Sequence, residues 1–430
     1  MRSPATCAIG MMPEAVQTRA LIATDVRAQE SSVENFLLAS GHDQRILPIL
    51  SVAMIEPVGG HGGMHYYDFG LCGGLTAAGC SVTLYTCDET VDPEIPGLAV
   101  RPSYGDIYRL NGRALKAVSY ITRTFRSLRD ATAAERRICH FHAFGDLLPE
   151  LIVTAIAKLL RMHIVLTVHD VVSLAGGATR KRVFAGWLYR FADRIIVHNR
   201  ASLVELEEMG IPSAQIAVIP HGHSLPGPNS VRQQAAARDQ LGIAQSARVL
   251  LFFGQIKDTK GLDILIEALP RVIEEVPETL LVIAGRPWKT GFERFEALID
   301  RCQVRGSCHL QIGYVPDDMA SAYYAAADIV VLPYRRIYQS GVLLMAMSYA
   351  RPVVVSDLPG MTEVVTDGEN GYVFNSESKD DLAQVLTRAL LDEGRRSRIS
   401  AAALQYIQDN HDWNHIGRTT AELYRHVLRS

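Results

Sequence analysis

The residues best suited to chemistry lie in the segment from Leu332 to Pro352, where a basic and aromatic loop leads into an apolar helix. Arg335 and Arg336 precede Ser340, a favoured helix N-cap residue, and Gly341 follows it. A helix start presents free backbone N–H groups and the positive end of the helix dipole, and arginine adds donors that match phosphate oxygens. The segment therefore predicts an anion site of the kind that binds a diphosphate. The alternative is a plain connecting loop in which the arginines are solvated.

A second cationic feature is the run F-F-G-Q-I-K-D-T-K-G at residues 252–261, where a predicted strand ends and a helix begins. Lys260 stands directly before the helix expected from Gly261 to Ala268. A lysine in that place can neutralise phosphate charge. Taken alone, however, a Lys-Gly pair is more often part of a solvated loop.

Two further features follow strands in the first half of the chain. Four glycines fall within five residues at 59–63, after a strand expected at Leu47–Glu56, and glycine lets the backbone approach a ligand closely. The loop is not G-x-G-x-x-G, so a nicotinamide dinucleotide site is not indicated. His169 ends the strand expected from Ile164, where it could exchange a proton near neutral pH. A buried structural pair with Asp170 explains its position equally well.

The elements that position these residues are short apolar strands alternating with helices, which is typical of parallel sheets covered on both faces. The pattern predicts an α/β protein with two doubly wound, Rossmann-like domains that face each other across a cleft. Ligands of such sheets bind outside the carboxyl ends of the strands, so we expect the ligand in that cleft. The expected parts are a poorly ordered leader at 1–45, a first domain at 46–222, a Gly/Pro-rich linker at 223–246, a second domain at 247–412, and a C-terminal helix at 413–430 that packs back on the first domain. The strands are expected at Leu47–Glu56, Ser81–Cys87, Ile138–Phe144, Ile164–His169, Arg194–His198, Ile216–Pro220, Arg248–Phe253, Leu280–Ala284, Cys308–Tyr314, Asp328–Leu332 and Pro352–Ser356.

Composition limits the classes of protein to consider. The 430 residues are 48% hydrophobic and 21% charged, with a formal net charge of -3, which is typical of a soluble globular protein and does not indicate nucleic-acid binding. The seven cysteines are scattered without a C-x-x-C pair, so we expect neither a metal site nor a disulfide framework. No apolar run reaches the ~18 residues of a membrane span, and no signal pattern opens the chain. These features favour a cytoplasmic location.

From Val249 to Phe374 the sequence resembles the donor-binding half of a group 1, family 4 glycosyltransferase with the GT-B fold. The matching segments occur in the family's order: F-F-G-Q-I-K-D-T-K-G-L-D-I-L-I-E-A-L, L-V-I-A-G, G-Y-V-P-D-D-M-A-S-A-Y-Y-A-A-A-D-I-V-V-L-P-Y and A-R-P-V-V-V-S-D-L-P-G-M-T-E-V-V-T-D-G-E-N-G-Y-V-F. The first half resembles the family more loosely, through the glycine loop, V-H-D, and the blocks A-D-R-I-I-V-H-N and V-I-P-H-G. Together the resemblance covers residues 48–425, and it implies that 46–222 is the acceptor-side domain and 247–412 the domain that binds the nucleotide sugar.

The resemblance implies roles for individual residues in binding a nucleoside-diphosphate sugar. Lys260 stands at the family's phosphate-binding lysine, with Lys257 and Arg336 as further cations, and the Ser340-Gly341 helix start holds the diphosphate. His169 matches the histidine beside the transferred sugar and is the implied catalytic residue. The other implied donor-site residues are Gly62 and Gly63 of the glycine loop, Gly254, Tyr314 and Val315 at the nucleobase, Val342, and Glu363. Family members need no metal, because the helix dipole and cations stabilise the leaving diphosphate, and no cofactor beyond the sugar nucleotide is expected.

The sequence departs from the family at acidic positions of the donor site. Members carry two glutamates eight positions apart across this loop and helix, and Ile337 and Met345 stand there instead. Gln255 replaces the usual arginine of the preceding loop. Glu363 follows the next strand and could reach the donor, although a carboxylate at a helix start is the simpler role.

These features lead to one expectation and one rival. We expect a glycosyltransferase that moves a hexose from a nucleoside-diphosphate sugar to a glycan or lipid-linked acceptor, with retention at the anomeric carbon. Its setting would be exopolysaccharide or cell-envelope polysaccharide synthesis. The rival is a non-catalytic GT-B scaffold that binds a glycan or a partner enzyme, which the missing glutamates favour.

One predicted helix, at 113–129, bears on location. Apolar residues recur along it at helical spacing, and basic residues lie mostly opposite; the apolar positions are Leu115, Val118, Ile121, Phe125 and Leu128. Such a helix can lie on an anionic membrane surface, so peripheral contact at the cytoplasmic face is one expectation. The other, which the pattern favours, is that the apolar stripe packs on the sheet while the basic face stays solvated near a lipid-linked acceptor.

Overall fold

The computed structural model describes residues 49–62, 64–105, 107–143, 147–171, 178–223, 233–288 and 291–430. The chain divides into residues 1–48 and Ile49–Ser430, and every helix and strand named here belongs to the second unit. The leader expected at 1–45 therefore lies outside the described residues.

The first sheet is parallel, with its described strands in the order β3-β2-β1-β4-β5-β6-β7. The strands are β1 (Leu50–Ile55), β2 (Cys80–Cys87), β3 (Leu98–Gly105), β4 (Ile138–Ala143), β5 (His163–Val168), β6 (Arg194–Val197) and β7 (Ile216–Val218). The helices are α2 (Gly59–Gly62), α3 (His65–Ala77), α4 (Arg113–Ala133), α5 (Leu147–Leu159), α6 (Ala178–Phe191) and α7 (Arg200–Glu208). Every strand here except β3 confirms a predicted one. β3 lies at the sheet edge, where its partly exposed side chains give no continuous apolar run.

A second parallel sheet has the order β10-β9-β8-β11-β12-β13. Its strands are β8 (Arg248–Phe253), β9 (Thr279–Gly285), β10 (Cys308–Ile312), β11 (Ile329–Leu332), β12 (Val353–Ser356) and β13 (Tyr372–Phe374). The remaining helices are α8 (Gln234–Leu241), α9 (Leu262–Glu275), α10 (Glu293–Arg301), α11 (Asp317–Ala326), α12 (Gly341–Ser348), α13 (Pro359–Thr362), α14 (Lys379–Leu391), α15 (Glu393–Asn410) and α16 (Trp413–Arg429). The short β13 was not predicted, because three residues are too few to show a period.

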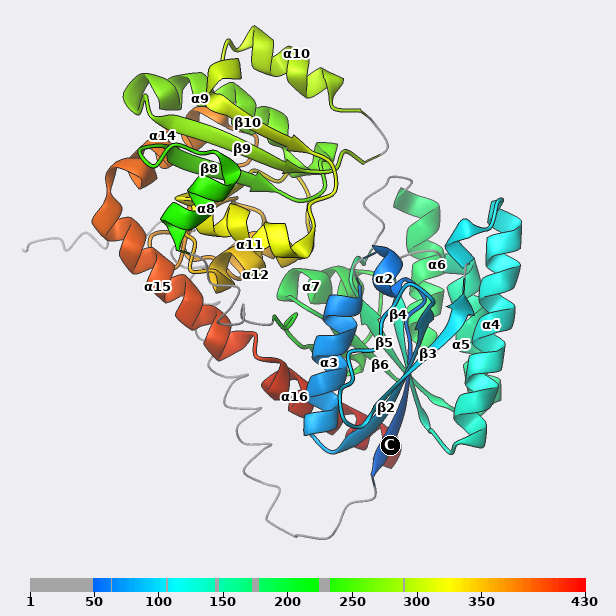
Figure 1. The fold of residues 1–430 in the computed structure, drawn as a ribbon. Helices are drawn as coiled ribbons and strands as arrows, with labels where there is room; N and C mark the ends of the chain where they lie inside the picture. Colours follow the sequence, from blue (N-terminus) through cyan, green and yellow to red (C-terminus); the bar gives the residue numbers. More distant parts are fainter. Residues whose placement is uncertain are drawn as a thin grey trace, which may run out of the picture. The chain divides into compact units, whose positions relative to one another are not determined.

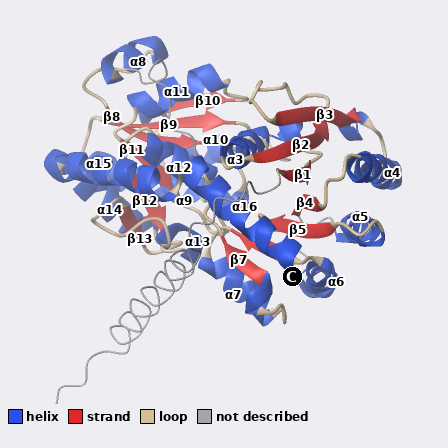
Figure 2. Cartoon of the chain, turned by 90° about the horizontal axis from the view of Figure 1, so that it is seen from below, coloured by secondary structure: helices blue, strands red, loops and turns tan. Residues whose placement is uncertain are grey.

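Both sheets are doubly wound, as the sequence predicts. Each strand order reverses at a switch point, between β1 and β4 in the first sheet and between β8 and β11 in the second. Helices flank the strands of both sheets in the two views of Figures 1 and 2. Four buried apolar clusters line the sheet faces, two for each sheet. Burial on both faces explains why the strands read as continuous apolar runs.

The C-terminal helix returns to the first sheet. Figure 1 shows α15 and α16 running from the helices of the second sheet to α3, and α16 packs directly on α3. A Cβ added to Gly74 of α3 would lie 2.0 Å from the carbonyl oxygen of Trp413, and one on Gly417 would lie 2.1 Å from the carbonyl carbon of Gly74. Glycines at this crossing therefore permit the close approach of the two helices.

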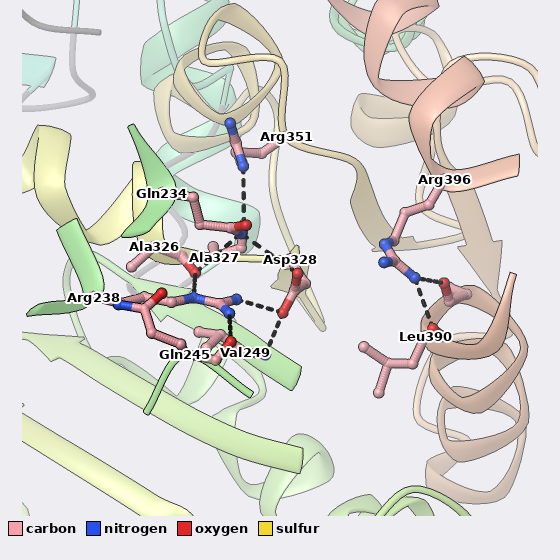
Figure 3. Close-up of polar contacts among 11 residues, drawn as sticks. Gln234, Arg238, Gln245, Val249, Ala326, Ala327, Asp328, Arg351, Leu390 and Arg396 are labelled. Carbon is pink, nitrogen blue, oxygen red and sulfur yellow. Dashed lines mark hydrogen bonds and ion pairs between the residues drawn. The ribbon is translucent and has the colours of Figure 1, made fainter. Parts of the chain in front are cut away.

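The segment expected as a linker, 223–246, is not a linker throughout. Residues Gln234–Leu241 form α8, whose apolar side is buried against the second sheet. Arg238 fastens the helix there, as Figure 3 shows: its Nη2 donates to Oδ2 of Asp328 and its Nη1 to the carbonyl oxygen of Gln245, both at 2.8 Å. The prediction missed α8 because the segment has few large apolar residues and its anchor is a buried ion pair, which no local period reveals.

Helix α4 exposes part of its apolar stripe. Leu128 is buried, as expected for a stripe packed on the sheet, but Leu115, Val118 and Phe125 are 53%, 58% and 41% exposed. The buried face of α4 is lined instead by small and hydroxyl side chains near its C-terminal end, such as Thr124. The expectation that the whole stripe packs on the sheet is therefore wrong for Leu115, Val118 and Phe125, while Ile121 is partly buried against the core of the first sheet.

Candidate functional site

The loops after β8 and β11 meet where the strand order of the second sheet reverses. Gly261 has a φ of +63°, and a Cβ added to it would lie 1.8 Å from the carbonyl oxygen of Pro333. The backbone N–H of Arg335 donates to the carbonyl oxygen of Thr259 at 2.9 Å. Glycine accommodates both the left-handed conformation and the close approach, so the turn after Lys260 is built directly against the loop after β11.

Lys260 is the cation at this junction. Its Nζ lies 3.6 Å from the centroid of the Tyr334 ring, and Oγ of Ser340 donates to the Tyr334 hydroxyl at 3.5 Å. The residue as a whole is partly exposed, yet its ammonium is enclosed by protein. Burial lowers the pKa of Lys260 to about 7, and the negative charge of Asp170 partly opposes that change. A nearby anionic ligand would stabilise the protonated, charged form of Lys260, which burial destabilises.

The start of α12 lies beside this lysine. Oγ of Ser340 accepts from the backbone N–H of Leu343 at 3.3 Å, which confirms the predicted N-cap. A Cβ added to Gly341 would meet no atom within 4 Å, so the space at the first turn is open. A Cβ on Gly254, whose φ is +105°, would lie 3.3 Å from Cγ2 of Val342. The predicted donor-site residues around this helix start are therefore neighbours in space.

The two arginines of the loop before α12 have different surroundings. Arg335 donates to both carboxylate oxygens of Asp263 at 2.6 and 2.8 Å, and to Glu377 at 2.9 and 3.0 Å. The guanidinium of Arg335 therefore pairs with two carboxylates rather than with a phosphate, and these pairs stabilise the loop before α12. Arg336 is exposed, and its pairing with a phosphate stays a prediction.

The loops after β9 and β10 carry exposed aromatic rings beside this site. The N–H of Gly313 joins the two loops by donating to the last residue of β9 at 3.0 Å. Tyr314, predicted at the nucleobase, is 70% exposed, and Val315 packs against the apolar core. The partly exposed ring of Trp288, which the sequence did not single out, lies 4.7 Å from Nζ of Lys257. Exposed rings on these loops suit stacking on a planar base.

The first sheet places His169 beside the loop that joins β11 to α12 in the second sheet. His169 follows β5 and is buried, and its Nδ1 lies 3.1 Å from Nε2 of Gln339. Beside it, Nδ2 of Asn199 donates to the carbonyl oxygen of Tyr338 at 2.5 Å. The catalytic candidate therefore sits next to the loop that leads into α12. The sequence does not single out Gln339, because only the fold brings together residues this far apart along the chain.

A row of histidines crosses the carboxyl ends of four neighbouring strands of the first sheet. His142, His169, His198 and His221 end or follow β4, β5, β6 and β7, with adjacent ring centroids 5.2, 5.2 and 5.5 Å apart. Tyr67 from α3 packs edge-on against all four rings. Burial lowers the pKa of every ring, so the row is neutral at neutral pH. The sequence held a signal for it, since two of the predicted strands end in His169 and His198, a third contains His142, and His221 directly follows the fourth.

The glycine loop after β1 closes into the short helix α2. Gly59 has a φ of +44°, and its N–H donates to Oε2 of the buried Glu56 at 2.5 Å, while the N–H of Val58 donates to Oε1 at 2.9 Å. Gly62 ends α2, and Gly63 lies outside the described residues. Their contact with donor or acceptor stays a prediction.

Glu363 follows α13 of the second sheet, but its carboxylate lies at the start of α7, a helix of the first sheet. Its carboxylate accepts from the backbone N–H groups of Arg200 and Ala201, the first residues of α7, at 2.6 and 2.8 Å. A carboxylate in this position satisfies free N–H groups and complements the helix dipole. The simpler of the two roles considered for Glu363 therefore describes its contacts, with the helix supplied by the other sheet.

The arrangement as a whole offers cationic and dipolar contacts for an anion. Lys260 and the start of α12 lie together, and Asp170 of the first sheet acts electrostatically on both Lys257 and Lys260. Such a site stabilises negative charge that develops on a leaving group. Among the residues that the structure describes, no group of three or more His, Cys, Asp or Glu side chains is arranged to hold a metal ion.

Comparison with known proteins gives consistent matches in both halves. Residues 233–406 match the family described as glycosyl transferases group 1, and residues 61–225 match glycosyltransferase family 4. D-inositol 3-phosphate glycosyltransferase of Kribbella flavida is 30% identical over 245 residues, which are 54% of this chain and 56% of that protein. An uncharacterised glycosyltransferase of Methanocaldococcus jannaschii is 31% identical over 192 residues, 44% and 47% of the two chains. The match thus spans about half the length of these relatives.

Solved structures share the fold over nearly their full length. Sucrose-phosphate synthase from Thermosynechococcus elongatus superposes with a TM-score of 0.73 at 19% identity, covering 88% of this chain and 99% of that one. The HepE protein of Anabaena in complex with UDP-glucose gives 0.69 at 19% identity, with 87% and 99% covered. Because two family models match along 61–225 and 233–406, over two doubly wound sheets, this chain belongs to the group 1 and family 4 glycosyltransferases of the GT-B fold.

Proposed function

We propose that this protein transfers a hexose from a nucleoside-diphosphate sugar to a glycan or lipid-linked acceptor. The observation that carries the proposal is Lys260, whose ammonium is enclosed beside the N-capped, open start of α12. A cation and a helix start in one place suit a diphosphate. One solved neighbour holds UDP-glucose, which supports this donor class, and several matched proteins are named as D-inositol 3-phosphate glycosyltransferases.

In the proposed reaction, the bond between the anomeric carbon and the diphosphate oxygen breaks, and a bond to an acceptor hydroxyl oxygen forms with retention of configuration. The bonding electron pair leaves with the nucleoside diphosphate, where Lys260 and the dipole of α12 stabilise its charge. The acceptor's proton passes to the departing phosphate oxygen. His169 is neutral and buried, and it serves as a hydrogen-bond partner of the transferred sugar. We place the reaction in exopolysaccharide or cell-envelope polysaccharide synthesis.

The first test is a screen of sugar nucleotides for protection against thermal unfolding and for slow donor hydrolysis. At least one of the UDP-, GDP-, ADP- or dTDP-linked hexoses should raise Tm, and Lys260→Ala should abolish that shift. Lys379→Ala is the matched control, because Lys379 is exposed and pairs with Glu267 outside the site. If no sugar nucleotide protects the protein at millimolar concentration, the donor assignment fails. Proton NMR of the product's anomeric signal then decides between retention and inversion.

The rival function, a non-catalytic scaffold, rests on the absence of the paired glutamates at Ile337 and Met345. Lys260→Ala in the living cell separates the two functions. A folded Lys260→Ala protein that no longer supports polysaccharide synthesis favours catalysis. Full function of that variant favours the scaffold.

We also propose that α4 contacts an anionic membrane surface, where a lipid-linked acceptor would lie. The exposed apolar side chains Leu115, Val118 and Phe125 share one side of the helix, and the exposed Arg126 and Arg129 are on the same helix. Apolar contact plus a cationic flank is the pattern of interfacial helices. None of the helices within the described residues has the length and apolar character to cross a bilayer, so the proposed contact is peripheral.

Vesicle sedimentation tests the membrane proposal. The protein should bind vesicles containing phosphatidylglycerol more strongly than vesicles of pure phosphatidylcholine, and added salt should weaken that binding. Replacing Leu115, Val118 and Phe125 together by serine should abolish it. Leu391→Ser is the control, because Leu391 is 66% exposed on the second sheet's α14. Equal binding by both variants would overturn the proposal.

A further inference from the structure

A chain of polar side chains, all buried except the partly exposed Gln339, links the glycine loop, His169 and the loop before α12. Nε2 of Gln339 lies 3.1 Å from Nδ1 of His169, and Nε2 of that ring lies 3.3 Å from Nδ1 of His142. The same nitrogen of His142 lies 3.6 Å from Oδ1 of Asp68 on α3, and both side chains are fully enclosed. Glu56 neighbours Asp68 and ends the chain at backbone N–H groups of the glycine loop.

Asp68 is the unusual member, because it is fully buried and, apart from the carboxyl group of Glu56, neither of its oxygens has a hydrogen-bond partner. An ionised carboxylate there would lose its hydration without compensation. Burial, and then the charge of Glu56, raises the pKa of Asp68 well above its usual range. Burial also raises the pKa of Glu56, but the N–H groups of Gly59 and Val58 oppose that rise. Glu56 therefore carries the charge of the pair, and Asp68 keeps the proton.

A protonated Asp68 decides how the protons are placed on both rings. A neutral imidazole has one N–H donor and one acceptor nitrogen. A charged Asp68 would draw the ring proton of His142 to Nδ1. A neutral acid does not, so Nδ1 of His142 can accept and the ring proton lies on Nε2, which has no hydrogen-bond partner among the described residues. Nε2–H of His169 then donates to Nδ1 of His142, and Nδ1 of His169 is left as an acceptor. The amide nitrogen of Gln339, the group that faces Nδ1, donates to it.

We propose that Asp68 and His142 are positioning residues, which orient His169 and hold its proton on Nε2, so that the Nδ1 lone pair is presented to the donor side. The proposal rests on the proposed glycosyl transfer, because a hydroxyl of the donor sugar is what that lone pair would accept from. The amide nitrogen of Gln339 contacts that lone pair, and Gln339 lies on the loop that leads to the proposed diphosphate site. Ring orientation and donor binding are thereby joined through one buried chain.

His140 supplies a matched control. It lies two residues before His142 on β4 and is equally buried, but its ring nitrogens contact Tyr424 at 2.5 Å and Thr167 at 2.6 Å rather than His169. Replacing either histidine removes a buried ring from the same strand. Of the two replacements, only that of His142 removes the ring that contacts Nε2 of His169.

The kinetic test compares His142→Leu, His142→Asn and His140→Asn with the wild-type protein. His142→Leu should lower kcat at least about tenfold while KM for the donor stays within about twofold, because the diphosphate contacts are untouched. His142→Asn should recover much of kcat, since its amide offers a polar atom near the position of Nδ1. His140→Asn should keep kcat. Equal losses in His142→Leu and His140→Asn would overturn the proposal and mark the effect as structural.

Asp68→Asn is the second variant, because an amide has the shape of the neutral acid and cannot ionise. It should keep kcat and its pH profile close to those of the wild type, whereas Asp68→Leu should not. A large loss in Asp68→Asn would show that the ionised carboxylate is needed, which contradicts the proposal.

NMR gives a readout that does not depend on turnover. In protein labelled with 15N-histidine, the His169 signals are identified by their loss in His169→Asn, and their shifts show which nitrogen carries the proton. A proton on Nε2 in the wild type, lost or mixed in His142→Leu, supports the proposal; a proton on Nδ1 in the wild type overturns it. Failure of the proposed glycosyl transfer would appear separately, as a protein that binds no sugar nucleotide while its His169 tautomer is as expected.

Discussion

The ammonium nitrogen of Lys260 lies 3.6 Å from the centre of the Tyr334 ring, so the cation of the proposed diphosphate site lies against an aromatic face rather than in bulk water. A cation–π contact contributes about 0.5–2 kcal/mol, which replaces only part of the lost hydration. The pKa of Lys260 falls to about 7 in consequence. The lysine is thus poised to gain its full charge when an anion arrives.

Donor binding should weaken as pH rises from about 7 to about 9. Below pH 7 Lys260 is protonated in the free protein; above it, binding of a diphosphate must take up a proton, because the bound anion raises the pKa again. The Kd for UDP, or for the nucleotide found in the screen, should rise by up to about tenfold per pH unit. Isothermal titration calorimetry in two buffers of different ionisation heat measures the uptake. Lys260→Arg should give a flat profile, and a flat wild-type profile would contradict the assignment.

Lys260→Met should stabilise the ligand-free protein while abolishing donor binding. The folded-state pKa of about 7 is below the ordinary value of 10.5, so the unfolded chain binds more protons between these values, and the wild type's free energy of unfolding rises with pH across that window. The gain in Lys260→Met should be roughly 1–4 kcal/mol at pH 7 and should shrink toward pH 10. Urea denaturation at several pH values measures it. A gain that is constant with pH would exclude the lysine's charge as its cause.

Ser340→Ala should lower the free energy of unfolding by about 0.5–2 kcal/mol, because the N–H of Leu343 loses its capping partner. Ser340→Asp separates the cap from the ligand site. It should retain most of the stability, since Asp is an equally good cap, but its charge should repel a diphosphate and raise Kd at least about tenfold. Chemical denaturation and donor titration of the same proteins provide both readings. Tight donor binding by Ser340→Asp would move the diphosphate away from this helix start.

Glu363→Gln should lower the free energy of unfolding and weaken the contact between the two halves of the chain, and it should leave binding of the donor sugar unchanged. Its carboxylate accepts from the backbone N–H groups of Arg200 and Ala201, so the loss of charge at the start of α7 should cost about 0.3–1 kcal/mol. The KM for the donor and the choice of sugar should change little. A loss of kcat beyond about a hundredfold, with stability unchanged, would instead show that Glu363 contacts the donor.

Arg238→Ala should destabilise the second sheet's half of the chain by about 3–5 kcal/mol. Removing this side chain leaves Asp328 buried without its cation, and α8 loses its anchor. Arg305→Ala is the control: its ion pair with Asp300, at 3.0 Å, is exposed and should be worth at most about 1 kcal/mol. Thermal and urea unfolding of both variants provide the comparison. Equal effects would mean that α8 is held mainly by its apolar side.

The strands show how far local patterns reach. Segments such as 248–253 and 329–332 are buried on both faces of the sheet, so their continuous apolar runs predict strands without any knowledge of the neighbouring strands. β3 and α8 were not predicted. β3 lies at the sheet edge and has partly exposed side chains, and α8 is held by a buried ion pair with a residue distant in the sequence, so neither shows a clear local pattern. The exposed side of α4 was misplaced for a related reason: a helical period shows that apolar residues share a side, but it does not say which side faces the sheet.

By itself, the sequence determined the doubly wound architecture, the N-cap at Ser340 and the position of Lys260 before a helix, because these follow from periodicity, cap chemistry and short-range order. The tertiary structure decided what those groups meet. It placed Tyr334 under Lys260, turned Arg335 onto two carboxylates, and set Gln339 against His169. The physical reason is that a side chain's charge, tautomer and partner depend on burial and on neighbours far along the chain, and only the folded molecule brings these together.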